Sequence, residues 1–154
     1  MGGLMVNPFT GISQEPQPAT FKMELVKEFV IAGHGNLEKV KLLMAENPNL
    51  VYCSYDWGNG DFEQAIEGAG HVGNKEIARY LIENGARPNI YVLTMLGETE
   101  LVKNMLAKYP ALLKSKGPHG FTLLHHATKG GDDAKALLEY FKEMGMREMQ
   151  RKIK

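Results

Sequence analysis

The feature that most constrains this chain is an internal repeat. The segment HGNLEKVKLLMAENPNLV at His34 resembles HVGNKEIARYLIENGARPNI at His71, and two further copies start at Leu96 and Gly130. Each copy places a glycine before a polar stretch and then apolar residues three or four positions apart. Each therefore predicts an amphipathic helix of about eleven residues, which is too short to be stable unless its apolar stripe is covered.

A second helix-compatible stretch precedes each of these glycines: MELVKEFVIAG, EQAIEGAGHVG, YVLTMLG and TLLHHATKGG. The repeating unit is therefore helix, glycine turn, helix, and such units are stable when they stack and share a core. The glycines between the two helices are Gly35, Gly73, Gly97 and Gly131, with spacings of 38, 24 and 34 residues.

Two stretches resemble the ankyrin-repeat family. Residues 122–127 read TLLHHA against the family's TPLHxA, with Gly120 at the place of the turn glycine, and residues 73–89 resemble GxxEIVxxLLxxGADxN. The resemblance extends over roughly residues 22–145 and includes small bacterial ankyrin-repeat proteins. It implies an all-α solenoid of about four helix-turn-helix repeats with one or two short hairpins. It also implies that Thr122 and His125 tie the turn to the start of the helix.

The repeats depart from the family pattern in places. The first and third repeats lack the TPLH motif. The 24-residue step, which is the spacing from Gly73 to Gly97, leaves little room for a finger, the hairpin loop that projects between successive repeats. The 38-residue step from Gly35 to Gly73 means that the connection between the first two repeats, NPNLVYCSYDWGNGDFE, is longer than usual. We expect an extended arm over residues 1–20, and a basic tail over 146–154 that is a solvated helix end, a terminal cap or a docking segment. Between them lies the repeat domain 21–145, with units at about 21–52, 53–88, 89–115 and 116–145.

Charge and cysteine content limit the partners and the compartment. Eighteen basic and eighteen acidic residues balance, so nothing at the level of the whole chain points to nucleic acid or an anionic membrane. No apolar run reaches the length of a membrane span. The single cysteine, Cys53, cannot form an intrachain disulfide and is typical of a reducing compartment. We expect a cytoplasmic monomer, and export stays open if residue 1 is not the native start.

The histidines are the candidates for a metal site. His125 and His126 are adjacent on a predicted helix and point about 100° apart, which disfavours joint ligation of one ion. We expect His119 to be exposed at a turn. His34 and His71 recur at the ends of first helices, where each is expected to bond a terminal carbonyl. The alternative is a small metal- or ligand-binding protein that uses His34 and His71 with Asp56 or Asp61.

The sequence does not predict an enzyme or a cofactor. No histidine is fixed near Cys53 by the sequence, and the serines lack a nucleophile-elbow motif. The GNG at residues 58–60 predicts a turn, because the glycine pattern that binds dinucleotides is absent.

A protein partner is the function that the repeat pattern favours. Solenoids present finger loops and first helices as a rigid concave surface, and aromatic side chains flanked by acids on a glycine turn are typical of interface hot spots. We therefore predict a non-catalytic interaction module, in which the first finger either binds the partner or packs onto its own repeats. The predicted contact residues are Tyr55, Asp56, Trp57, Asp61 and Phe62, with His119 and Phe121 on the finger of the last repeat.

Overall fold

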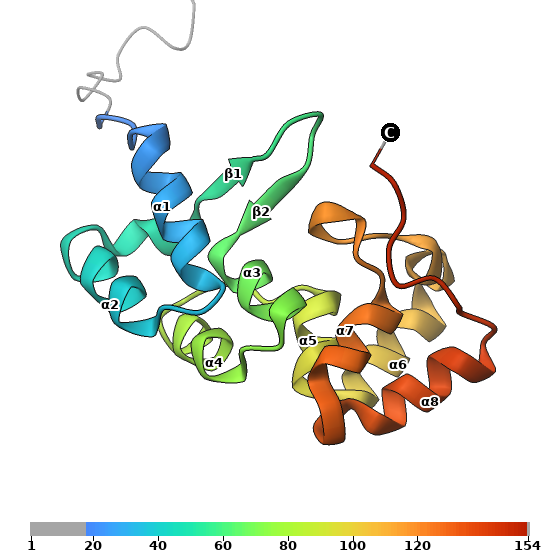
Figure 1. The fold of residues 1–154 in the computed structure, drawn as a ribbon. Coiled ribbons are helices and arrows are strands. Elements are labelled where there is room, and N and C mark those ends of the chain that lie inside the picture. The colour runs from blue at the N-terminus through green and yellow to red at the C-terminus, as the bar shows by residue number, and fades with distance from the viewer. Residues whose placement is uncertain (1–17, 154) are drawn as a thin grey trace, which may run out of the picture.

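The computed structural model describes residues 18–153, which are mostly helical with one small antiparallel sheet (Figure 1). Most of the arm predicted for residues 1–20 lies outside the described residues. The predicted pairs of helices are present: α1 (Met23–Gly33) with α2 (Leu37–Glu46), α3 (Ala65–Val72) with α4 (Lys75–Glu83), α5 (Ile90–Leu96) with α6 (Thr99–Lys108), and α7 (Leu123–Gly130) with α8 (Lys135–Glu143). No helix within this range is both long and apolar enough to cross a bilayer.

Asparagines and glycines set the turns between paired helices. The side chains of Asn36 and Asn74 accept a hydrogen bond from a backbone N–H in the first turn of α2 and of α4, which satisfies one of the free donors at a helix start. Gly73 and Gly97 end α3 and α5 with φ values of 86° and 81°, a left-handed conformation that glycine adopts without steric cost.

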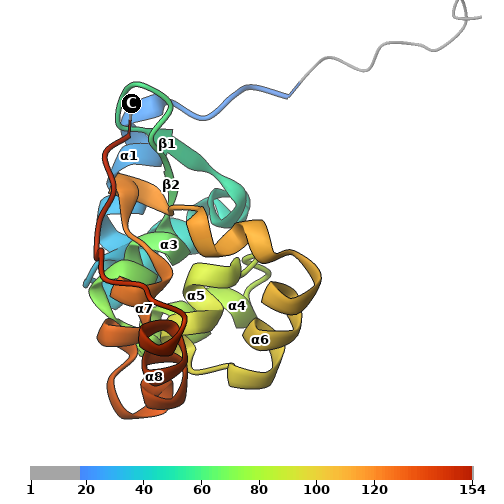
Figure 2. The same cartoon turned by 90° about the vertical axis from the view of Figure 1, so that its right-hand side faces the viewer.

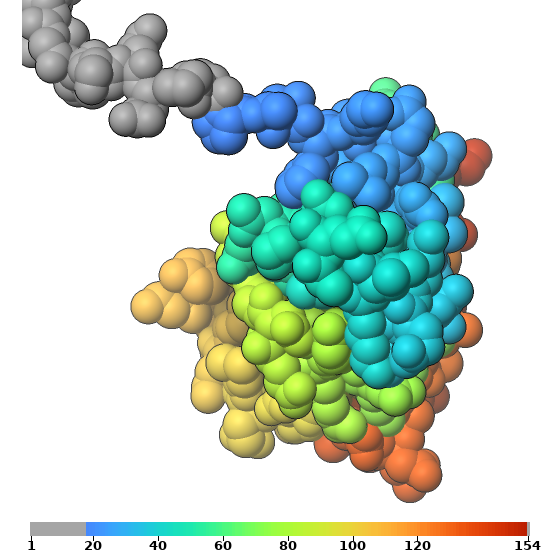
Figure 3. All heavy atoms as spheres, turned by 90° about the vertical axis from the view of Figure 1, so that its left-hand side faces the viewer, coloured from blue at the N-terminus to red at the C-terminus, as the bar shows by residue number. Residues whose placement is uncertain are grey.

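The first helices of successive pairs contact one another in chain order, α1 with α3, α3 with α5 and α5 with α7. Gly33 makes the first of these contacts possible, because a β-carbon there would lie 2.3 Å from the carbonyl oxygen of Ala65. The second helices α2, α4 and α6 follow one another on one side of the molecule as cyan, lime and yellow bands (Figure 3). The core has two clusters, one around Phe29 and Ile66 and one around Leu123 and Phe141.

A hairpin projects from the connection between the first two helix pairs. A 3₁₀ turn, η1 (Pro48–Tyr52), leads into β1 (Ser54–Asp56), which pairs antiparallel with β2 (Phe62–Gln64). The turn between the strands contains Gly58, Asn59 and Gly60, all with positive φ. The predicted first finger is therefore present, and only a short connection separates α4 from α5, as the 24-residue step predicted.

The C-terminal segment folds back over the loop that precedes α7. That loop contains η2 (Pro110–Lys114) and η3 (Pro118–Gly120), and η4 (Gly131–Ala134) follows α7. The backbone N–H of Thr122 donates to the carbonyl of Met149, and that of Arg151 donates to the carbonyl of Gly120. Residues 146–153, called the C-terminal strap below, therefore lie along this loop (Figure 2). Of the three expectations for this tail, the solvated helix end is wrong in one respect: residues 146–153 are not helical. Most of them are exposed, but these backbone hydrogen bonds hold the strap against the loop.

Candidate metal centre

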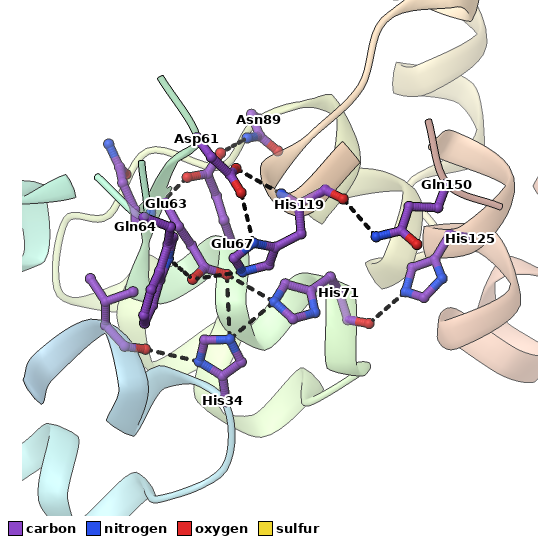
Figure 4. A network of polar contacts seen from close by, with 12 residues as sticks. His34, Asp61, Glu63, Gln64, Glu67, His71, Asn89, His119, His125 and Gln150 are labelled. Carbon is purple, nitrogen blue, oxygen red and sulfur yellow. Dashed lines mark hydrogen bonds and ion pairs between the residues drawn. The ribbon is translucent and has the colours of Figure 1, made fainter. Parts of the chain in front are cut away.

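Four titratable side chains from four different elements meet beside the base of the hairpin (Figure 4). His34 caps the end of α1, His71 lies in the last turn of α3, Glu63 lies on β2 and His119 lies on η3. Each offers one possible ligand atom, and these four atoms lie within 4.8 Å of one another. Stacking of the helix pairs therefore brings together residues that are far apart in the sequence.

Three of these atoms form a compact triangle. Nε2 of His71 lies 2.8 Å from Oε1 of Glu63 and 3.0 Å from Nε2 of His34. Nε2 of His34 lies 3.4 Å from the same Oε1. Ligand atoms around a tetrahedral zinc ion, each at about 2.0–2.1 Å from the metal, are separated by about 3.3 Å. The triangle therefore has nearly the size of one face of such a site.

Glu63 is a charged residue with no exposed surface. Burial alone would raise its pKa, but hydrogen bonds and charge interactions with His34 and His71 outweigh burial and lower that pKa to about 2. Its second oxygen, Oε2, accepts a hydrogen bond of 2.8 Å from the indole N–H of Trp57. Glu63 is therefore ionised, with one oxygen fixed by Trp57 and the other turned toward the two histidines.

His34 presents a lone pair to the cluster. Its Nδ1 lies 3.0 Å from the carbonyl oxygen of Val30. Because a carbonyl only accepts, Nδ1 carries the proton, and Nε2 of the neutral ring is free to bind a metal. The hydrogen bond to Glu63 raises the pKa of His34 despite the opposing effect of burial. His34 and His71 were both expected to bond terminal carbonyls. This is correct for His34 and wrong for His71, whose Nε2 faces Glu63 and His34.

His119 is held firmly at the edge of the cluster. Both oxygens of Asp61 bind it, Oδ1 accepting from the backbone N–H at 2.8 Å and Oδ2 facing Nδ1 at 2.9 Å. Gln150 of the C-terminal strap donates to its carbonyl oxygen. Its Nε2 lies 3.4 Å from Oε2 of Glu63, and its side chain is 29% exposed. The expectation of an exposed turn residue is therefore wrong, because Asp61 draws the ring inward.

The other predicted contact residues of the hairpin separate into two groups. Trp57 and Asp61 support the cluster through Glu63 and His119. Asp56 accepts a hydrogen bond from the backbone of Gly58 within the turn, and Phe62 points outward with 57% of its surface exposed. The hairpin therefore packs onto its own repeats and also exposes an aromatic side chain. Tyr55 is half-buried with its ring edge-on to Trp57.

His125 of the TLLHHA motif and the preceding Phe121 position His71. Thr122 caps α7 by accepting a hydrogen bond from the backbone N–H of His125, as the resemblance implied. The imidazole of His125 was expected to bond the turn that precedes its own helix. Its Nε2 instead lies 2.8 Å from the carbonyl oxygen of His71. Phe121 stacks on the rings of both His71 and His125. His126 bonds the carbonyl of Thr122, away from the cluster.

Two further groups near the hairpin have structural partners. The Glu67 carboxylate accepts hydrogen bonds from the backbone of Gln64 and from the side chain of Asn89, which fixes the start of α3. The Cys53 thiol lies 3.7 Å from the carbonyl of Asn49, and burial raises its pKa. A raised pKa disfavours the thiolate that a nucleophile or a metal ligand needs.

Comparison with protein-family models, with curated proteins and with solved structures gave no match. Two imidazole nitrogens and one carboxylate oxygen, with a third imidazole beside them, are a donor set suited to a divalent transition metal.

Proposed function

We propose that this chain binds one divalent transition metal ion, with zinc as the best fit, through His34, Glu63 and His71. The observation that carries the proposal is the triangle of Nε2, Nε2 and Oε1 with edges of 2.8, 3.0 and 3.4 Å. The mixture of nitrogen and oxygen donors favours zinc or cobalt over calcium and magnesium, which prefer oxygen ligands.

No arrangement of protons on the two histidines gives all three pairs of atoms in this triangle a favourable hydrogen bond. Nδ1 of His34 already donates to Val30, so its Nε2 is an acceptor while the ring is neutral. A single proton on Nε2 of His71 can point toward His34 or toward Glu63, but not toward both. If His34 is also protonated, two N–H groups face each other at 3.0 Å. A cation at the centre attracts all three atoms at once, which is the physical reason for preferring it.

The supporting hydrogen bonds are those that a metal site needs. Ligating histidines usually donate their second ring N–H to a carbonyl or carboxylate, which fixes the ring and its tautomer. Val30 serves His34 in this way, and Asp61 holds the neighbouring His119, which is not one of the three proposed ligands. Trp57 holds the oxygen of Glu63 that does not face the triangle. A bound ion would join α1, the hairpin and α3, and would stabilise the packing of the first two helix pairs.

For the architecture, we propose an ankyrin-type solenoid of four repeats. The support is the chain-order contact of α1, α3, α5 and α7, the second helix that follows each of them, and the threonine cap at the TLLHHA motif. We also propose a non-catalytic, cytoplasmic monomer. The raised pKa of Cys53 disfavours a cysteine nucleophile, which supports the non-catalytic part of this proposal.

A protein partner is a second candidate function, favoured by the exposure of Phe62 and by the 36% exposure of Trp57 on one hairpin. Trp57 and Asp61 are poor probes of a partner, because their substitution would disturb the histidine cluster. Phe62→Ser is the better variant. Loss of a captured partner by zinc-loaded Phe62→Ser protein supports this candidate, and equal capture by both proteins contradicts it.

Elemental analysis after dialysis tests metal binding. Protein stripped with a chelator is dialysed against zinc, and we expect about one ion per chain in the wild type. His71→Ala and Glu63→Gln should lose the ion, because each removes a corner of the triangle. Asp56→Asn is the matched control, since Asp56 bonds Gly58 within the turn and should leave binding unchanged. A wild type without zinc, or a His71→Ala variant that binds equally tightly, contradicts the proposal, provided that circular dichroism shows folded protein.

A further inference from the structure

We propose that residues 114–122, called the acceptor loop below, form a docking site for an extended peptide, and that the C-terminal strap occupies this site within the same chain. The partner that the loop fits is an extended segment of another protein in which a glutamine is followed by an arginine. The strap then competes with that partner for the loop. This inference does not rest on the metal centre; it gives the second candidate function a surface and a sequence.

The strap pairs with the acceptor loop through its backbone. The N–H of Arg151 donates to the carbonyl of Gly120 at 2.8 Å, and the N–H of Thr122 donates to the carbonyl of Met149 at 3.0 Å. The two segments run antiparallel at this place. Proteins bind extended peptides along an exposed edge by the same kind of pairing. Because backbone groups form these bonds, a segment of another chain can form them equally well.

Two side chains of the strap contact carbonyl oxygens of the loop. The side-chain amide of Gln150 donates to the carbonyl of His119 at 2.7 Å (Figure 4). The guanidinium of Arg151 donates to the carbonyl of Lys114 at 2.8 Å, and it also binds Glu148 within the strap. Since a carbonyl oxygen only accepts, the loop selects donors at two consecutive positions of the peptide. A glutamine followed by an arginine meets this requirement.

The acceptor loop also has two features suited to an incoming backbone. Gly120 has a φ of 77°, and a β-carbon there would overlap the carbonyl oxygen of Arg151. The absence of a side chain therefore lets the strap approach the loop closely. The ammonium group of Lys116 donates to the carbonyl of Lys152 at 2.6 Å, a contact that any residue at that position of a peptide can provide.

The strap is packed loosely enough to be replaced. Among residues 146–153 only Met146, at the start, is buried. A cavity of about 570 Å³ borders the strap and is lined by Asp61, His119 and residues 150–153. Segments that bury little apolar surface open at a lower free energy than the core of a protein. Hydrogen bonds therefore hold the strap on the loop, and release leaves the apolar clusters of the repeats intact.

A synthetic peptide with the sequence of residues 148–153, EMQRKI, tests the docking site. It carries blocked ends and a fluorescent label, and it is added to the full chain with Arg151→Pro, which removes both the N–H and the guanidinium that bind the loop. We expect saturable binding by fluorescence anisotropy. Binding to the wild type should be at least about 10-fold weaker, because the tethered strap competes at a high effective concentration.

Two controls identify the contacts that bind the peptide. A peptide with Gln150→Glu and Arg151→Leu should bind at least about 10-fold more weakly, since it loses two side-chain hydrogen bonds. Addition of Gly120→Ala to the Arg151→Pro protein should abolish binding, because the β-carbon occupies the space of the peptide backbone. Circular dichroism checks that both protein variants are folded.

Hydrogen exchange of the unmodified chain gives a second test. The N–H of Thr122 bonds the strap, whereas the N–H of His126 bonds the carbonyl of Thr122 within the start of α7. Release of the strap exposes the first N–H and leaves the second protected. We therefore expect the protection factor of Thr122 to be at least about 10-fold lower than that of His126.

Each other result overturns the inference. Equal protection of Thr122 and His126 means that the strap opens only together with the helix. An Arg151→Pro protein that does not fold, or that folds and binds no peptide, identifies the strap as a terminal cap of the repeats. Equal binding by wild type and variant, or binding that survives Gly120→Ala, places the peptide elsewhere. None of these results changes the metal proposal, which elemental analysis tests separately.

Discussion

The indole N–H of Trp57 donates a 2.8 Å hydrogen bond to Oε2 of Glu63, while Oε1 of the same carboxylate faces His34 and His71. The hairpin therefore supplies both the buried acid and the group that orients it. Trp57 is the chain's only tryptophan. Its fluorescence consequently reports on one place in the molecule, which makes metal binding simple to follow.

Removing the indole N–H should weaken the metal site without unfolding the protein. We expect Trp57→Phe to lower zinc affinity about 10- to 100-fold, as loss of a supporting hydrogen bond to a ligand typically does. Competition with a chelating dye measures this affinity. Phe62→Leu is the control, because Phe62 lies on the same strand as Glu63 and points outward. Unchanged affinity in Trp57→Phe contradicts the orienting role.

Above about pH 6.5, the free energy of unfolding should fall with rising pH in the apo protein and increase with rising pH in the zinc-loaded protein. The pKa of His34 is raised in the folded apo protein, so its contribution to stability is present below the unfolded value of 6.5 and is lost as pH rises through the folded pKa. In the loaded protein, rising pH removes protons that compete with zinc, so stability increases. Glu63 stays ionised throughout, since its pKa is about 2.

Urea unfolding between about pH 6.5 and 8.5, with either a chelator or zinc present, measures both slopes. This window avoids His126, whose pKa burial lowers to about 3 and which therefore changes stability only at lower pH. His34→Gln should abolish the dependence of the unfolding free energy on pH in the apo protein. Parallel slopes for apo and loaded wild type would mean that zinc does not compete with protons for this cluster.

The contact of α1 with the start of α3 depends on the absence of a side chain at Gly33. We expect Gly33→Ala to cost about 1–3 kcal/mol of unfolding free energy or more, because its β-carbon would lie 2.3 Å from the carbonyl oxygen of Ala65. Gly35→Ala is the matched control, since a β-carbon there has open space, and its effect should stay within about 1 kcal/mol. Denaturant titration compares the two. Equal costs would argue against the close approach.

Thr122 connects the start of α7 to the C-terminal strap. Its hydroxyl donates to the carbonyl of Glu148 and accepts from the N–H of His125, with no exposed surface. We expect Thr122→Ala to cost about 1–3 kcal/mol, because buried partners lose their hydrogen bonds. Thr122→Ser keeps the hydroxyl and should recover much of that loss. Hydrogen exchange should also show faster exchange at Arg151, whose N–H bonds the adjacent Gly120. An unaffected strap contradicts this coupling.

The helices and their turns could be predicted because their signals are local. Apolar spacing located both helices of each pair, the GNG sequence located the hairpin turn, and Thr122 was correctly expected to cap its helix. The C-terminal strap was not predicted, since its hydrogen bonds to residues 120–122 leave no pattern within REMQRKIK.

The candidate site was predictable only in part, because it depends on contacts between repeats. The recurrence of His34 and His71 suggested a pair, and their Nε2 atoms lie 3.0 Å apart. Glu63 was missed because it lies in a connection without a counterpart in the other repeats. The side of the hairpin on which the Glu63 side chain lies is set by the strand register, which pairs Glu63 with Tyr55. His119 reaches Asp61 across 58 positions of the chain, a distance that no local pattern encodes.

X-ray absorption at the zinc edge tests the central claim most directly, because it measures the atoms around the bound ion. The account predicts nitrogen and oxygen neighbours at about 2.0–2.1 Å and outer-shell scattering from at least two imidazole rings. The imidazole signal should persist in Asp56→Asn and be lost in His71→Ala. A zinc ion surrounded by oxygen atoms without imidazole scattering, or an unchanged spectrum in His71→Ala, would contradict the account.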